Sequence, residues 1–161
     1  MVRHTRLVFG LTLNYTGYPM VRQAREMVLA GELGSLRLIQ VEYPQAWPAT
    51  PLERTGQKQA EWRTDPGVPA GRWAIFGTHA YNLAWFGTGR ICEQVAADVT
   101  TFVPGRRPDD NVQVMLRCSG RRKRGRCGAS RVAAGNENNL RLRVYGEKGR
   151  PGLAAGRFPT N

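Results

Sequence analysis

The sequence is poor in several residue types on which whole function classes depend. Its 161 residues include two histidines, three cysteines, and 12 acidic residues against 24 lysines and arginines. The cysteines (Cys92, Cys118 and Cys127) are odd in number and have no CxxC spacing. We therefore expect neither a disulfide framework nor a metal site, and we expect a reducing, cytoplasmic location. No apolar run reaches the roughly 20 residues of a membrane span, and residues 1–10 lack the apolar stretch of a signal peptide.

The excess of positive charge is concentrated in one segment. The net charge is +12, and residues Arg117–Arg131 hold seven basic side chains and no acidic one. One interpretation is a solvated face or loop, and another is a small basic nucleic-acid-binding protein that uses this run. The run contains no aromatic residue and the chain has no known binding motif, which argues against the second interpretation.

The first half of the chain predicts a helix followed by a strand. Pro19 suits a first helical position, and apolar residues then recur at three- and four-residue spacing. These residues are Met20, Val21, Ala24, Met27 and Val28. Gly31 and Gly34 are expected to end the helix. Residues Leu36–Tyr43 then predict a strand, with a slip in its alternation before Val41, that stops at Pro44.

The second half predicts a second helix and further strands. The helix starts at Gly77 and places Ala80, Leu83 and Ala84 on one face. Three strands are expected, at Gln94–Phe102, Val112–Cys118 and Leu140–Tyr145, the last alternating apolar residues with arginine. This order predicts an α+β fold with an open, mainly antiparallel sheet that has helices on one face. Residues 1–10 form a lead-in, 11–149 the domain, and 150–161 an irregular tail.

Four segments in order carry a family resemblance. They read NYTGYPMVRQAREMVLAGELGSLRLIQVEY, WRTDP, GTHAYNLAWFGTG and NENNLRLRVYGEKG. Together they resemble the C-terminal domain of the Gfo/Idh/MocA family of NAD(P)-dependent oxidoreductases, over roughly residues 10 to 149. In that family this domain supplies the substrate pocket and often the oligomer interface, and an N-terminal Rossmann domain binds the cofactor.

The resemblance implies roles for particular residues. His79 would be the catalytic acid/base that handles the proton of a substrate hydroxyl. The substrate, a sugar, polyol or related hydroxy compound, would be bound by Asn14, Tyr15, Trp62, Arg63 and Thr78. Structural alternatives stay open. His79 would then only bond nearby backbone, Tyr15 and Trp62 would pack in the core, and Arg63 would be a solvated loop residue.

Two departures from the family pattern bear on activity. No G-x-G-x-x-G follows a strand, so we expect no Rossmann domain here and no NAD or NADP bound by this chain alone. The family places an aspartate four residues before the histidine, where this chain has Ile75. The sequence thus predicts the substrate and oligomerisation half of an oxidoreductase, truncated and inactive alone. The alternatives are the nucleic-acid-binding protein or a non-catalytic scaffold that dimerises through its sheet.

Compensating frameshifts are a hypothesis for the departures. With codons that we chose, Gly71–Phe76 shifts to a reading that restores Gly-Asp before Gly77. Lys123–Gly128 similarly shifts to the apolar Lys-Gly-Ala-Leu-Trp. The basic run would then stand where a buried strand belongs. Because a core does not accept unpaired charges, we expect the segment to be extruded and its strand to be lost from the sheet.

Overall fold

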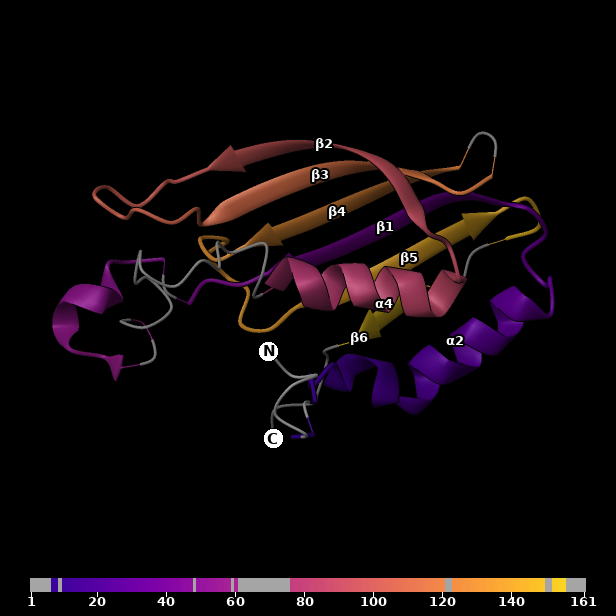
Figure 1. The fold of residues 1–161 in the computed structure, drawn as a ribbon, viewed down its shortest axis with the longest axis horizontal. Coiled ribbons are helices and arrows are strands. Elements are labelled where there is room, and N and C mark those ends of the chain that lie inside the picture. The colour runs from indigo at the N-terminus through magenta and orange to yellow at the C-terminus, as the bar shows by residue number, and fades with distance from the viewer. Residues whose placement is uncertain are drawn as a thin grey trace.

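The computed structural model describes residues 7–8, 10–47, 49–58, 60, 76–120, 123–149 and 152–155, with backbone alone for 53 and 152–155. These described residues form one sheet of six strands with helices on one face (Figure 1). In chain order the elements are η1 (Asn14–Gly17), α2 (Pro19–Leu29), β1 (Leu36–Pro44), η2 (Leu52–Thr55), α4 (Thr78–Thr88), β2 (Cys92–Thr100), β3 (Asn111–Cys118), β4 (Arg124–Ser130), β5 (Leu140–Gly146) and β6 (Gly152–Ala155). The predicted α+β class is confirmed.

The sheet is mixed, with antiparallel pairs predominating. The strand order is β2-β3-β4-β1-β5-β6. Strands β1 and β4 pair in parallel, and the other neighbouring pairs described are antiparallel. In Figure 1, α2 and α4 lie on the same side of this sheet. Helix α4 contacts β1, β4 and β5, while α2 contacts α4 and β6. One face of the sheet is therefore built into the core, as the sequence predicted.

Strand β1 contains a slip, as predicted, but the slip lies between Leu36 and Leu38 and not between Leu38 and Val41. The register between β1 and β5 shifts between Leu36 and Leu38. As a result Leu36 and Ile39 are both buried beneath the helices, and Leu38 lies on the opposite face. A shift by one residue moves every later side chain to the other face, so the irregularity keeps Val41 and Tyr43 in the core.

The basic run contradicts our expectation that it would be extruded. Residues 124–130 form β4, which pairs with β3 on one side and β1 on the other. Alternation explains this placement: Gly125, Cys127 and Ala129 are buried on the helix side, and Arg124 and Arg126 are exposed on the opposite face. Since side chains of a strand point to opposite faces in turn, the charges of Arg124 and Arg126 stay out of the core.

The predicted irregular tail is also wrong in part. Residues 152–155 form strand β6, which pairs antiparallel with β5 at the edge of the sheet. The sequence analysis missed this strand and β4 because neither has a run of large apolar residues. Both are assigned by pairing with a neighbouring strand.

The turn after β5 is held against the loop between α2 and β1. The amide of Lys148 donates to the carbonyl of Leu33 at 2.9 Å, and the amide of Glu147 donates to the carbonyl of Ser35 at 3.1 Å. Gly146 lies so close to this loop that an added Cβ would be 2.2 Å from the Leu33 carbonyl oxygen. Gly146 begins the turn Gly-Glu-Lys-Gly. A residue without a side chain is required there because its backbone lies so close to that of Leu33.

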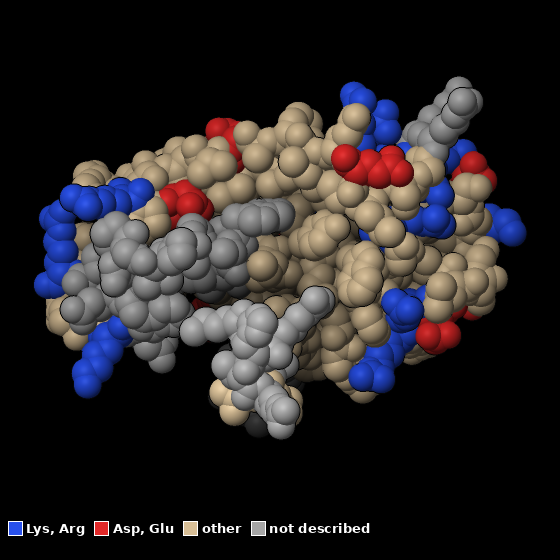
Figure 2. All heavy atoms as spheres, viewed as in Figure 1, with Lys and Arg blue, Asp and Glu red and all other residues tan. Residues whose placement is uncertain are grey.

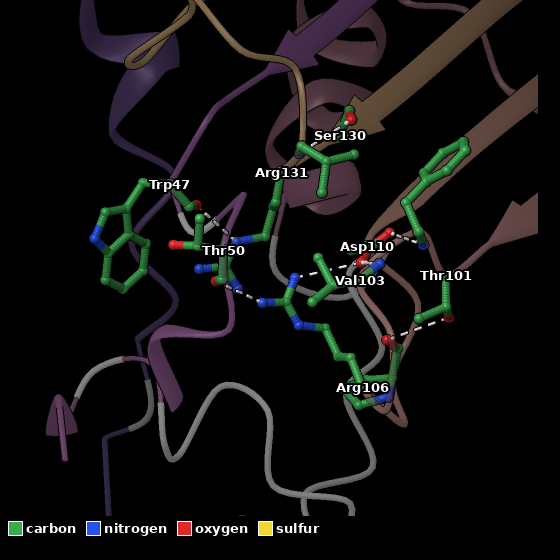
Figure 3. A network of polar contacts seen from close by, with 11 residues as sticks. Trp47, Thr50, Thr101, Val103, Arg106, Asp110, Ser130 and Arg131 are labelled. Atoms are coloured by element: carbon green, nitrogen blue, oxygen red, sulfur yellow. Dashed lines mark hydrogen bonds and ion pairs between the residues drawn. The ribbon is translucent and has the colours of Figure 1, made fainter. Parts of the chain in front are cut away.

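A buried ion pair anchors the loop between β2 and β3 (Figure 3). The Asp110 carboxylate accepts the backbone amides of Phe102 and Val103 at 2.8 and 3.0 Å, and pairs with Arg106 at 3.3 Å. Arg106 also donates to the carbonyl of Thr50, which lies in the long loop after β1. The side chains of Arg106 and Asp110 are both inaccessible to solvent. Such a pair tolerates loss of neither partner, because the other charge would remain buried.

Arg131, the last residue of the basic run, is buried beside this network. Its amide donates to the carbonyl of Asp110 at 2.9 Å, and its Nε donates to the carbonyl of Trp47 at 3.1 Å. The guanidinium lies over the rings of Trp47 and Phe76, 5.0 and 5.2 Å from their centroids. Aromatic faces attract a desolvated cation, so this arginine belongs to the interior and not to a basic surface.

We predict that Gly146→Ala destabilises the fold by about 3 kcal/mol, since the added methyl group must displace backbone and not a flexible side chain. Urea denaturation followed by tryptophan fluorescence measures this change in the free energy of unfolding. Gly17→Ala is the matched control, because nothing lies within 4 Å of a Cβ built there. Equal stability of the two variants would contradict the close approach of Gly146 to Leu33.

Candidate functional site

A cluster of aromatic and amide side chains gathers where the start of α4 meets the end of β1. His79 is the second residue of α4, and its imidazole stands edge-on to the ring of Tyr15 from η1, with centroids 5.2 Å apart. The ring of Tyr43, near the end of β1, lies 6.4 Å from the imidazole and 5.2 Å from the ring of Phe76. Three segments distant in sequence, η1, β1 and the start of α4, thus meet at one histidine.

A closed ring of hydrogen bonds fixes the two tyrosines. Asn138, in the loop before β5, donates through Nδ2 to the Tyr15 hydroxyl at 3.3 Å. The Tyr15 and Tyr43 hydroxyl oxygens are 2.5 Å apart, and the Tyr43 hydroxyl donates to Oδ1 of Asn138. Gln45 donates to the same Oδ1 at 2.9 Å. Mutually bonded groups of this kind hold one another in a fixed geometry.

Two titratable groups of this cluster, the Tyr43 phenol and the His79 imidazole, are held in their uncharged forms. Burial raises the pKa of Tyr43 well above its usual range, and the hydrogen bond with Tyr15 raises it further. Burial lowers the pKa of His79, because the charged imidazolium loses its hydration. Nδ1 of His79 is buried and has no hydrogen-bond partner among the described residues. The site therefore presents a neutral imidazole beside phenol and amide groups.

The structure brings together some of the residues predicted from sequence. Tyr15 and His79 are in contact. Asn14 lies in the same 3-10 turn as Tyr15 and is exposed, and Thr78 is the exposed first residue of α4. Trp62, Arg63 and Ile75 lie outside the described residues, so their predicted roles stay predictions.

Three members of the cluster were missed by sequence reasoning: Tyr43, Gln45 and Asn138. Their sequence signal is weak, consisting of a tyrosine and a glutamine around the proline that ends β1 and an asparagine within an NENN run. They meet because β1 and β5 are antiparallel neighbours, with the Asn139 amide donating to the Pro44 carbonyl at 3.4 Å. No spacing along the chain predicts that contact.

Among the described residues there is neither a metal site nor a membrane-spanning helix. They contain no group of three or more His, Cys, Asp or Glu side chains placed to hold a metal ion. None of the helices described is long and apolar enough to cross a bilayer.

A comparison with known protein families identifies the family to which this chain belongs. The model of the GFO/IDH/MocA C-terminal domain matches residues 21–150, most of the chain. The chain belongs to the Gfo/Idh/MocA family. It corresponds to the C-terminal domain of these oxidoreductases, as the sequence resemblance predicted.

Individual relatives agree with this assignment. An oxidoreductase from Sinorhizobium meliloti is 42% identical, with a TM-score of 0.77, over 94% of this chain and 38% of that chain. An inositol dehydrogenase homolog from Azotobacter vinelandii, solved in complex with NAD+, is 27% identical with a TM-score of 0.80, over 86% of this chain and 36% of that one. Bacillus subtilis (strain 168) has a relative, "Uncharacterized oxidoreductase YfiI", that is 27% identical over 88% of this chain and 37% of its own length. The chain thus spans little more than a third of the length of these relatives.

The nucleic-acid interpretation is not favoured. On the face shown in Figure 2, the lysines and arginines of the described residues lie mostly toward the two ends of the molecule. The described arginines of the basic run are in two situations: Arg117, Arg124 and Arg126 are exposed on β3 and β4, and Arg131 is buried. The match to the Gfo/Idh/MocA C-terminal domain accounts for most of the chain, and that domain is part of an oxidoreductase and not a nucleic-acid-binding protein.

We predict that His79 titrates below the 6.5 of an unperturbed histidine, the value expected in the unfolded chain. The unfolded chain then binds the proton more readily than the folded one, so stability is retained above pH 6.5 and falls as the pH drops below it. NMR titration of the imidazole protons, assigned with His79→Gln, measures the folded value. The same titration in urea gives the reference, and a folded pKa at or above that reference would contradict burial of the ring.

Proposed function

We propose that this Gfo/Idh/MocA domain is the substrate-binding half of an NAD(P)-dependent oxidoreductase that acts on a polyol, sugar or related hydroxy compound. The observation that carries the proposal is the neutral cluster around His79. Phenol and amide groups donate and accept hydrogen bonds without charge, which matches the paired donor and acceptor character of neighbouring hydroxyl groups. An Azotobacter vinelandii inositol dehydrogenase homolog complexed with NADH and myo-inositol, 26% identical to this chain, supports the same substrate class.

His79 is the proposed acid/base. Its lowered pKa keeps the imidazole neutral near pH 7, and a neutral imidazole is the form that accepts a proton from a hydroxyl group. Tyr15 lies edge-on to the imidazole and limits its orientation. Asn14, Thr78, Trp62 and Arg63 are proposed as further substrate contacts. The aspartate that the family pattern places four residues earlier is Ile75 here, so we propose that burial in place of a carboxylate sets the pKa of His79.

The residues of this chain do not fit a nicotinamide dinucleotide. The sequence has no G-x-G-x-x-G loop to approach a pyrophosphate closely. We propose that NAD or NADP is bound by a Rossmann domain outside this sequence and that this chain alone is inactive. The chain's own contribution is then to bind the substrate, orient one hydroxyl and take its proton at the imidazole.

We also propose that the domain forms homo-oligomers through the face of the sheet opposite the helices. That face carries Met115, which is 65% exposed, beside a hollow lined in part by Gln40, Glu42, Arg126 and Arg143. Arg143 donates to Glu42 there at 3.3 Å, so part of the charge is already paired. We place the protein in the cytoplasm because its cysteines are free.

Analytical ultracentrifugation tests the oligomer. We expect Met115→Lys to weaken self-association at least tenfold, because the added charge must be desolvated in the contact and lies beside the positive charge of Arg126. Thr101→Lys, on the exposed loop after β2, is the control and should leave association unchanged. A wild-type protein that stays monomeric at every concentration would contradict the proposed interface.

The substrate class is tested by binding to this chain. We expect myo-inositol to bind the wild type, and we expect Tyr15→Phe and Asn138→Ala each to weaken binding about 2- to 10-fold, since each removes a hydrogen-bonding group. Titration calorimetry measures both effects. Glu26→Gln, an exposed change on α2, is the control.

A test of the catalytic role of His79 requires a domain that binds the cofactor. In a chimera that joins this chain to the N-terminal part of the Sinorhizobium meliloti oxidoreductase, we expect His79→Gln to lower turnover about 100-fold or more while leaving polyol binding nearly unchanged. A loss of binding with turnover of the bound polyol unchanged would assign His79 to recognition only.

A further inference from the structure

Two of the three cysteines face each other across neighbouring strands. Cys92, the first residue of β2, is the register partner of Cys118, the last residue of β3. These strands are antiparallel, and directly opposed side chains in such a pair lie on the same face of the sheet. Both residues belong to the helix side, where Cys118 is a core residue and Cys92 packs against the core.

The hydrogen-bond pattern places this pair where side chains approach most closely. The amide of Ser119 donates to the carbonyl of Ile91 at 2.8 Å, so Ile91 and Ser119 occupy a hydrogen-bonded position. Positions alternate along an antiparallel ladder, which makes Cys92 and Cys118 a non-hydrogen-bonded pair, followed by a register shift between Cys92 and Gln94. Regular pairs of this kind have a Cα separation of about 4.5 Å. That separation lies inside the range of roughly 4.4–6.8 Å that a disulfide spans.

The two thiols differ in access, as an attacking and a resolving thiol do. Cys92 is partly exposed, and its Sγ lies 3.4 Å from the carbonyl oxygen of Gln94 along its own strand. Cys118 is buried, and burial raises its pKa first, followed by the negative charge of a Cys92 thiolate. That second effect places the two sulfurs within electrostatic range of each other. Cys127 is the contrasting case, because burial raises its pKa to about 12 within the core.

We propose that Cys92 and Cys118 form a reversible redox modification site, which a hydroperoxide converts to an intramolecular cross-strand disulfide. The Cys92 thiolate attacks the distal oxygen of the peroxide, the O–O bond breaks, and water or an alcohol leaves. Cys118 sulfur then displaces the hydroxyl of the resulting sulfenic acid, the S–S bond forms, and the thiol proton leaves with hydroxide as water. Two thiols are oxidised by two electrons and one peroxide is reduced. A dithiol reverses the step.

The disulfide would act on the connection that leads from the site helix into the sheet. Helix α4 carries His79 as its second residue and ends at Thr88. Three further residues lead to Cys92, where β2 begins. A covalent bond at Cys92 ties this connection to β3, an attachment made otherwise by hydrogen bonds between Ile91 and Ser119. We expect the oxidised protein to unfold about 5–10 °C higher than the reduced one, because the closed loop is restricted in the unfolded chain.

The pairing is tested on this chain by peptide mapping. Trypsin is expected to release the three cysteines on separate peptides, residues 91–106, 118–121 and 127–131, so each possible pair has its own mass. After treatment of the reduced protein with hydrogen peroxide we expect a linked product of 91–106 with 118–121, two mass units lighter than the sum of the two peptides. Free thiols should fall from three to one per chain, and dithiothreitol should restore all three.

Variants separate the proposal from general oxidation. Cys127→Ser is the matched control and should keep the linked product, whereas Cys92→Ser and Cys118→Ala should abolish it and the rise in melting temperature. Cys92 is only partly buried, so its variant keeps the test valid if Cys118→Ala fails to fold. The proposal is overturned if Cys92 is oxidised to sulfinic acid while Cys118 stays free. A product that contains Cys127, or that links two chains, would overturn it equally.

Discussion

The parallel pairing of β1 with β4 in the middle of the sheet is the contact on which the rest of the molecule depends. It joins the β2-β3-β4 half of the sheet to the β1-β5-β6 half, and α4 packs across the junction. The pairing sets Val41 beside Cys127 and Tyr43 beside Ala129. Small side chains on β4 leave room for the larger ones of its neighbours. An added Cβ at Gly125, for example, would lie 3.2 Å from that of Leu116.

The same pairing explains how a chain with this charge forms a core. Every second residue of β4 faces away from the helices, so Arg124 and Arg126 stay in water while their neighbours are buried. The cost of a buried charge arises where one is actually enclosed, at Arg131 and at the Arg106–Asp110 pair. Those charges lie beyond the strand ends, where aromatic rings and backbone carbonyls surround them. Composition alone does not distinguish these two situations.

The candidate site forms where the ends of two strands and the start of a helix meet, and no single sequence motif contains it. Tyr43 and Gln45 lie where β1 ends, Asn138 lies where β5 is about to begin, and His79 lies where α4 begins. Because these ends coincide in space, neutral polar groups collect around one imidazole whose hydration is reduced. Burial lowers the pKa of this imidazole, whereas a carboxylate before the histidine, as in the family pattern, would raise it.

The sequence by itself determined the elements whose signals are local: the Pro19 helix, the helix after Gly77, the strands of large alternating apolar residues, the family, and Tyr15 and His79 as site candidates. Only the tertiary structure decided that residues 124–130 form a central strand, that residues 152–155 extend the sheet, and that Tyr43, Gln45 and Asn138 join the site. The physical reason for the central strand and the site is pairing between segments about 90 residues apart, as β1 and β4 are. Residues 152–155 become a strand by pairing with β5, which is close in sequence. Glycine, cysteine and alanine are weak strand formers alone, and they become a strand here because neighbouring strands supply the hydrogen bonds and α4 supplies the cover.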